Sequence, residues 1–112
     1  MKLITCITRQ GRLDAVLNAL REEGVRGVTV SGGARGGQAT GRAAYYGGEE
    51  YTPELSPKIK IEVLAPAEHC ERLVGVVGDA ARTGEVGDGK VWVVAVESVL
   101  RIRMGEVGRE AV

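Results

Sequence analysis

Residues 83–96 read Thr83-Gly84-Glu85-Val86-Gly87-Asp88-Gly89-Lys90-Val91-Trp92-Val93-Val94-Ala95-Val96, a glycine-rich turn followed directly by an apolar run. The run from Val91 to Val96 does not alternate, which is typical of a strand buried on both faces. Gly84 to Lys90 fit the first seven positions of a Walker A loop. That motif continues with Ser or Thr and then a helix, so Val91 and the strand after it exclude a P-loop.

The turn can still serve a phosphate, because its glycines expose backbone N–H groups and Lys90 brings a positive charge. Arg101 and Arg103 stand two apart in a segment, 100–103, that we expect to be a short strand. Alternate residues of a strand share one side, and two guanidinium groups near such a turn suit a polyphosphate. The plainer alternatives are a tight turn with a solvent-facing lysine and a solvated edge strand.

Working outward, hydrophobic periodicity predicts the other elements. Strands are expected over 2–8, 25–30 and from Pro57, where Ile59, Ile61 and Val63 alternate with charged residues. Helices are expected from about 13 to a stop at Gly24, and from Pro66 in a first turn to Gly84. The order predicts an α+β class, ferredoxin-like βαββαβ sandwich with two helices on one sheet face. Nothing remains to cover the other face, so we expect an oligomer.

Composition narrows the function. The 112 residues suit one domain, and 15 basic against 15 acidic residues give no basic excess for nucleic acid. No apolar run reaches the roughly 20 residues of a membrane span, and the polar start favours a cytoplasmic protein that is not membrane-inserted. Cys6 and Cys70 are expected to be buried thiols, since a cytosolic chain rarely forms disulfides. They share no metal-binding spacing with the single His69.

Four motifs in order resemble the PII signal transduction proteins. They are the run 83–96, Arg101-Ile102-Arg103-Met104-Gly105-Glu106, Pro57-Lys58-Ile59-Lys60-Ile61-Glu62, and Gly24-Val25-Arg26-Gly27-Val28-Thr29-Val30. The second differs from the family at Met104, where threonine is usual. The resemblance covers residues 1–112 as a single domain.

The resemblance implies a homotrimer that binds ATP or ADP between subunits. Phosphates would be held by the loop of about residues 83–90, with Arg101 and Arg103 supplied by a neighbouring subunit. The implied nucleotide-binding residues are Thr29, Gly37, Gln38, Glu62, Val63, Leu64, Gly87, Asp88, Gly89, Lys90, Arg101 and Arg103. A T-loop of about residues 36–56 would bind a target transporter or enzyme, and a tail would follow over 104–112. Tyr51 stands where the family's modifiable tyrosine lies, or it simply contacts a partner.

The base of this loop departs from the family. Gly37-Gln38-Ala39-Thr40-Gly41 replaces the usual Gly-Arg-Gln-Lys-Gly, whose glutamine helps to hold Mg²⁺ and 2-oxoglutarate. Arg9, Gly41 and Lys58 remain as possible contacts for that anion. The resemblance therefore implies either a nitrogen regulator that senses 2-oxoglutarate, or a divergent sensor of nucleotide or another small anion. An enzyme is not expected, because no Ser/His/Asp or Cys/His set stands out.

Overall fold

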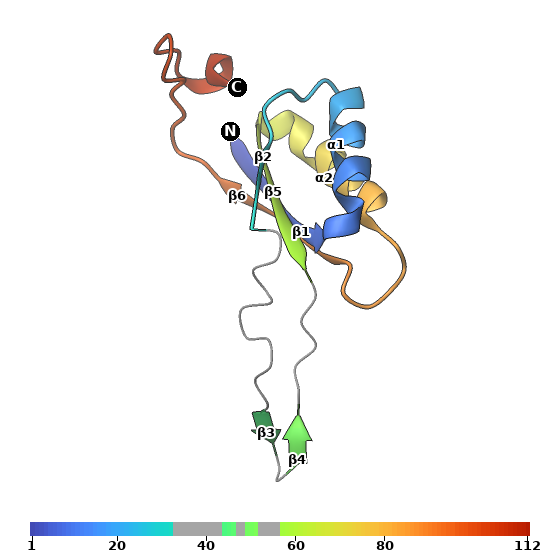
Figure 1. Ribbon diagram of the computed structural model, residues 1–112. Coiled ribbons are helices and arrows are strands. Elements are labelled where there is room, and N and C mark those ends of the chain that lie inside the picture. The colour runs from blue at the N-terminus through green and yellow to red at the C-terminus, as the bar shows by residue number, and fades with distance from the viewer. Residues whose placement is uncertain (33–43, 47–48, 52–56) are drawn as a thin grey trace.

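The computed structural model describes residues 1–32, 44–46, 49–51 and 57–112, with side chains for 1–32 and 57–112. Two helices lie on one face of a four-stranded sheet (Figure 1). The main elements are β1 Lys2–Arg9, α1 Leu13–Glu22, β2 Thr29–Ser31, β5 Lys58–Ala65, α2 Ala67–Ala81 and β6 Gly89–Ala95. A small ribbon pairs β3 (Ala44–Tyr46) with β4 (Glu49–Tyr51), and short 3₁₀ turns cover Gln10–Arg12 and Gly108–Ala111.

The sheet has the strand order β2-β5-β1-β6, and each neighbouring pair is antiparallel. β1 therefore lies in the centre, with Lys2 opposite both Ala65 of β5 and Ala95 of β6. The order of the two helices and the four sheet strands matches the predicted α+β, ferredoxin-like arrangement. The register also fixes which side chains share a face, because cross-strand partners point to the same side of a sheet.

The core lies between the sheet and the two helices. Alternate residues of β5 face it, as the charged-apolar alternation predicts. The helices contribute one stripe each, including Val16 and Leu20 of α1 and Leu73 and Val77 of α2. Cys6 and Cys70 are buried free thiols in this layer, as predicted, and burial raises the pKa of Cys6 above its ordinary value.

Two elements differ in their bounds from the predictions. The second strand begins at Thr29 instead of residue 25, because Val25 donates its N–H to the Leu20 carbonyl and continues the helix end. Val25 and Val28 pack against the core without joining the sheet. α2 begins at Ala67, directly after Pro66, and ends at Ala81 instead of Gly84.

The two C-terminal predictions are wrong for the single chain. β6 is an edge strand, and 42% of Trp92, 39% of Val93 and 46% of Val94 is exposed, so it is not buried on both faces. Residues 100–103 do not form a strand. They open a hairpin in which Leu100 makes an isolated bridge to Val107.

None of the described helices is both long enough and apolar enough to cross a bilayer.

Candidate functional site

The loop between α2 and β6 is organised by the side chain of Asp88. Its carboxylate accepts hydrogen bonds from the backbone N–H of Thr83 at 2.8 Å and of Gly84 at 2.9 Å. The Thr83 hydroxyl and, at 3.1 Å, the Arg9 Nε also donate to it. The bonds from Thr83, more than any other contact, hold the pKa of Asp88 well below its usual range. Asp88 therefore stays ionised and points into the loop.

Two cations from neighbouring strands hold the loop from outside. Arg9 of β1 and Lys58 of β5 are direct cross-strand partners. Arg9 donates to the Val86 carbonyl and Lys58 to the Gly87 carbonyl. Within the described part of the chain, the backbone N–H groups of Val86 and Gly87 have no acceptor. Val86 and Gly87 thus have their carbonyls occupied, while their N–H groups are left for an anion.

Gly89 is required by the close approach of two strands. Its φ is +104°, and a Cβ built there would lie 1.7 Å from the carbonyl oxygen of Ile7. No side chain fits at that distance, since non-bonded heavy atoms separate to about 3.5 Å. The glycine lets β6 begin against β1 and places Lys90 opposite Ile7.

Lys90 joins a cluster of positive charge on the sheet face that the helices leave uncovered, the open face. Its register partner is Ile7, whose partner on the other side is Lys60. Arg9 and Lys58 are two positions along on the same face. Four cations at one end of this face, Arg9, Lys58, Lys60 and Lys90, suit a ligand with several negative charges.

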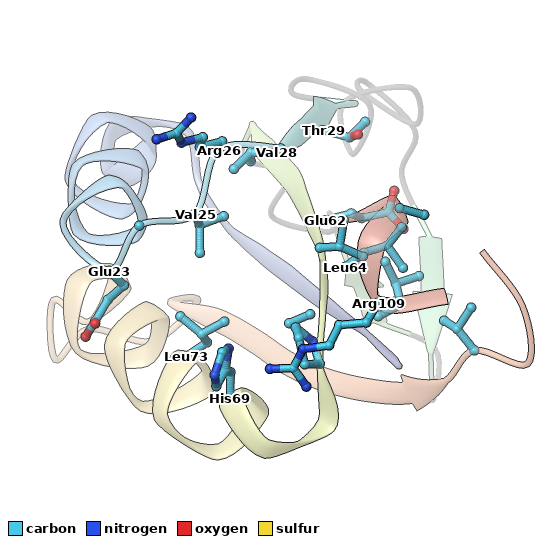
Figure 2. A pocket seen from close by; sticks show the side chains of 18 of the residues that line it. Glu23, Val25, Arg26, Val28, Thr29, Glu62, Leu64, His69, Leu73 and Arg109 are labelled. Carbon is cyan, nitrogen blue, oxygen red and sulfur yellow. The ribbon is translucent and has the colours of Figure 1, made fainter. Parts of the chain in front are cut away.

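A cavity of about 1060 Å³ opens at the other end of β5 (Figure 2). It lies between residues 23–29, the end of β5, the start of α2 and residues 109–112. It exists because β2 pairs only with Lys60–Glu62, so the chain before Thr29 stands away from β5. Its lining combines apolar side chains, such as Leu64 and Leu73, with the polar Thr29 and Glu62.

Three of the predicted adenine-side residues, Thr29, Glu62 and Leu64, line this cavity together. Thr29 and Glu62 are cross-strand partners and Leu64 follows on the same face. Val63 is 2% exposed and faces the helices, so only its backbone is available there. Gly37, Gln38 and Gly41 lie outside the described residues, and of Tyr51 only the pairing of its backbone with Ala44 is described.

The structure does not bring Arg101 and Arg103 to Lys90 within one chain. The C-terminal segment, residues 99–112, lies at the opposite end of the sheet from the loop before β6 (Figure 1). Arg101 is paired with Glu106, and Arg103 lies in the exposed turn of the hairpin. A site that combines these arginines with Lys90 requires a second chain.

Sequence reasoning missed Thr8 and Thr83, which shape the loop. The Thr8 hydroxyl donates to the Asp88 carbonyl at 2.8 Å across 80 residues, so no local pattern signals it. Thr83 lies five residues before Asp88, and the signal that could have found this contact is an aspartate inside a glycine-rich turn, whose carboxylate commonly accepts local hydrogen bonds. His69, Arg72 and Arg109 at the cavity were missed as well. No group of three or more metal-ligating side chains occurs among the described residues.

Comparisons with known proteins agree with this geometry. Residues 1–106 match the family described as Nitrogen regulatory protein P-II. The chain is 41% identical to Nitrogen regulatory protein P-II of Rhizobium meliloti, with all of both chains covered. It is 43% identical to Nitrogen regulatory protein P-II 1 of Methanothermobacter thermautotrophicus, covering 100% of this chain and 97% of that one. A crystal structure of Arabidopsis thaliana PII bound to citrate superposes with a TM-score of 0.79 at 33% identity, covering 98% of this chain and 90% of that one.

Proposed function

The chain belongs to the P-II family of nitrogen regulatory proteins, and from this premise we propose that it is a trimer that binds ATP or ADP between subunits. It acts in the cytoplasm and controls a target transporter or enzyme through residues 36–56. The family is one of signalling regulators, and no catalytic role is proposed.

The observation that carries nucleotide binding is the architecture of residues 83–90. Asp88 caps the loop from inside, Arg9 and Lys58 occupy the carbonyls of Val86 and Gly87, and the N–H groups of these two residues find no acceptor in the described part of the chain. Lys90 stands at the end of the loop on the open face. Backbone N–H groups beside a lysine are the usual chemistry for binding phosphates. Mg²⁺ would then accompany ATP through the phosphates, because the described residues offer no cluster of metal ligands.

The second half of the site comes from the cavity and the C-terminal segment of another subunit. Leu64 and Thr29 offer an apolar surface and a hydroxyl suited to a base, and the Glu62 carboxylate suits ribose hydroxyls. The open face presents Trp92 and Val94 beside Leu3, an apolar patch whose burial favours assembly. Trimer formation would bring the two half-sites together.

Calorimetric titration with ATP and with ADP tests the proposal. Lys90→Gln should weaken both affinities about tenfold, as expected for the loss of one charge-assisted contact. Lys2→Gln is the matched control, because Lys2 lies at the far end of the same sheet, opposite Ala95. Equal affinities for wild type and Lys90→Gln would remove the loop from the site.

A second candidate, a sensor of nucleotide without 2-oxoglutarate, is favoured by two observations. Ala39 stands at the position where the family resemblance implies a glutamine ligand. Arg9 and Lys58, the cations that 2-oxoglutarate would need, already bind the loop carbonyls. We expect weak binding of 2-oxoglutarate when ATP and Mg²⁺ are saturating, and tighter binding in Ala39→Gln. Low-micromolar binding by the wild type would instead favour the 2-oxoglutarate sensor.

A further inference from the structure

The C-terminal segment places one of the proposed phosphate-binding arginines against an acid of its own chain. Residues 99–108 form a hairpin in which Arg101 N–H donates to the Glu106 carbonyl at 2.8 Å. Gly105 N–H returns a bond to the Arg101 carbonyl at 2.8 Å, and Gly108 N–H bonds to Val99 at 2.9 Å. This backbone pairing sets the side chains of Arg101 and Glu106 opposite each other.

The guanidinium of Arg101 is held by this segment at both terminal nitrogens. Nη1 donates to Glu106 Oε2 at 3.1 Å. Nη2 donates to the Glu110 carbonyl at 2.9 Å and to the Val112 carbonyl at 3.5 Å. The group that would bind a phosphate is therefore used to hold the last residues of its own chain in place.

The same segment forms a wall of the cavity. Arg109 extends toward α2 (Figure 2). It makes an ion pair with Glu68 in the first turn of that helix. Arg109, Ala111 and Val112 line the cavity together with Thr29 and Glu62. One segment thus holds Arg101 and narrows the proposed adenine side of the site.

We propose that residues 99–112 are an intramolecular competitor of the nucleotide, with the Glu106 carboxylate in the place of a phosphate on Arg101. Nucleotide binding exchanges Glu106 for phosphate and releases residues 109–112 from the cavity. The inference deepens the proposed function and rests on it. Glu106 Oε1 is buried and, among the described residues, lacks any hydrogen-bond partner. A carboxylate with one oxygen unsatisfied is a poor permanent partner, and its exchange for a phosphate with more acceptor oxygens is favourable.

The direction in which one substitution changes ATP affinity shows whether Glu106 competes with the nucleotide or helps to bind it. If Glu106 merely orients Arg101 for the phosphate, removing its charge weakens nucleotide binding. If Glu106 competes, removing its charge strengthens binding. Linkage makes the effect reciprocal, because a segment that opposes the nucleotide must itself be loosened when the nucleotide binds.

The experiment compares Glu106→Gln with Glu110→Gln by calorimetric titration of ATP. Glu110 is the matched control, because it changes the same charge in the same segment yet its side chain makes no ion pair among the described residues. We expect Glu106→Gln to tighten ATP binding about fivefold or more, and Glu110→Gln to leave it unchanged. Arg109→Gln, which removes the tie to Glu68, should also tighten binding and serves if Glu106→Gln does not fold.

A second measurement follows the segment directly. Hydrogen exchange at the amides of Arg101, Gly105 and Gly108 should become faster in the wild type when ATP is saturating. Slower exchange, or weaker ATP binding by Glu106→Gln and Arg109→Gln, would overturn the competitor role and make Glu106 a positioning residue. Unchanged ATP affinity in Glu106→Gln and Arg109→Gln would also overturn it. Failure of wild type and both variants to bind ATP at all is a different result, which removes the proposed function and this inference with it.

Discussion

At the scale of the residue, the loop before β6 depends on two features that tolerate no other side chain: the close approach at Gly89 and the hydrogen bonds to Asp88. Gly89 is defined by a carbonyl 1.7 Å from where its Cβ would be, and Asp88 by four donors around one carboxylate. A sequence can flag such glycines and acids as a turn. It cannot reveal that Thr8, 80 residues away, completes the turn, because that contact depends on strand register.

Gly89→Ala should destabilise the fold by about 3 kcal/mol or more, because the methyl group meets the Ile7 carbonyl in a backbone conformation that alanine rarely adopts. Chemical denaturation followed by circular dichroism measures the change. Gly75→Ala is the control: it lies in α2 with nothing within 4 Å of its Cβ position, so it should stabilise by about 0.5–1 kcal/mol. Equal stability of the two variants would contradict the close approach.

Asp88→Asn should lower the melting temperature at neutral pH, because an amide cannot accept the same set of hydrogen bonds. The pKa of Asp88 is lowered from 3.8 in the folded chain, so its contribution is complete above the unfolded value and is lost as pH falls toward the folded one. The gap between wild type and variant should therefore stay constant down to about pH 4 and shrink below it. Asp79→Asn, at an exposed carboxylate paired with Arg82, should show little effect at any pH. A gap that closes near neutral pH would contradict the capping role.

At the scale of the element, hydrophobic periodicity correctly predicted the helices and strands that bury an apolar face in the core. It failed for segments that lie outside the core. β1, β5 and both helices lie close to their predicted positions, because each buries a regular apolar face. The residues before Thr29 and after Leu100 were predicted as strand and form none. Val25 bonds back to Leu20 at the helix end, and Arg101 bonds to Glu106 within a local hairpin. Three adenine-side residues that the resemblance implied, Thr29, Glu62 and Leu64, do line one cavity, whereas periodicity could not anticipate the arginine at 109.

The packing of α2 on β1 can be tested through its thiols. Cys6 lies on β1 and Cys70 on α2, both buried, and burial raises the pKa of Cys6. Neither thiol should react with a disulfide reagent at neutral pH until the chain unfolds, because the thiolate is the reacting form and access is closed. Labelling rates should rise in step with global unfolding by denaturant. Fast labelling of either thiol in the native protein would show that α2 separates from the sheet on its own.

At the scale of the whole molecule, the open face of the sheet is not covered by any helix in the described part of the chain (Figure 1). Trp92 is the register partner of Thr5 and points to the open face, away from the helices. With Leu3 and Val94 it forms an apolar patch that a single chain leaves exposed. This exposed patch is the physical reason to expect that the chain associates with copies of itself.

Sedimentation equilibrium at micromolar concentration should give three times the 11.8 kDa chain mass. Trp92→Glu should shift the protein to monomer, because a buried unpaired carboxylate opposes assembly. Val86→Glu is the matched control, since Val86 is 98% exposed on the loop before β6. A wild type that sediments as a monomer would remove the trimer, and with it the two-chain nucleotide site.

The central place of β1 has a consequence for how the chain is made. Of the four strands of the sheet, β1 is synthesised first, and it pairs with residues 58–65 on one side and 89–95 on the other, so one of its edges stays unpaired until β6 has been synthesised. Such distant pairing slows folding, because long loops must close before the contacts form. Loss of residues 2–9 removes the middle of the sheet, whereas loss of residues 100–112 removes none of its four strands. Synthesis that stops anywhere before β6 therefore yields a sheet with its central strand still unpaired along one edge, a product suited to proteolysis and not to signalling.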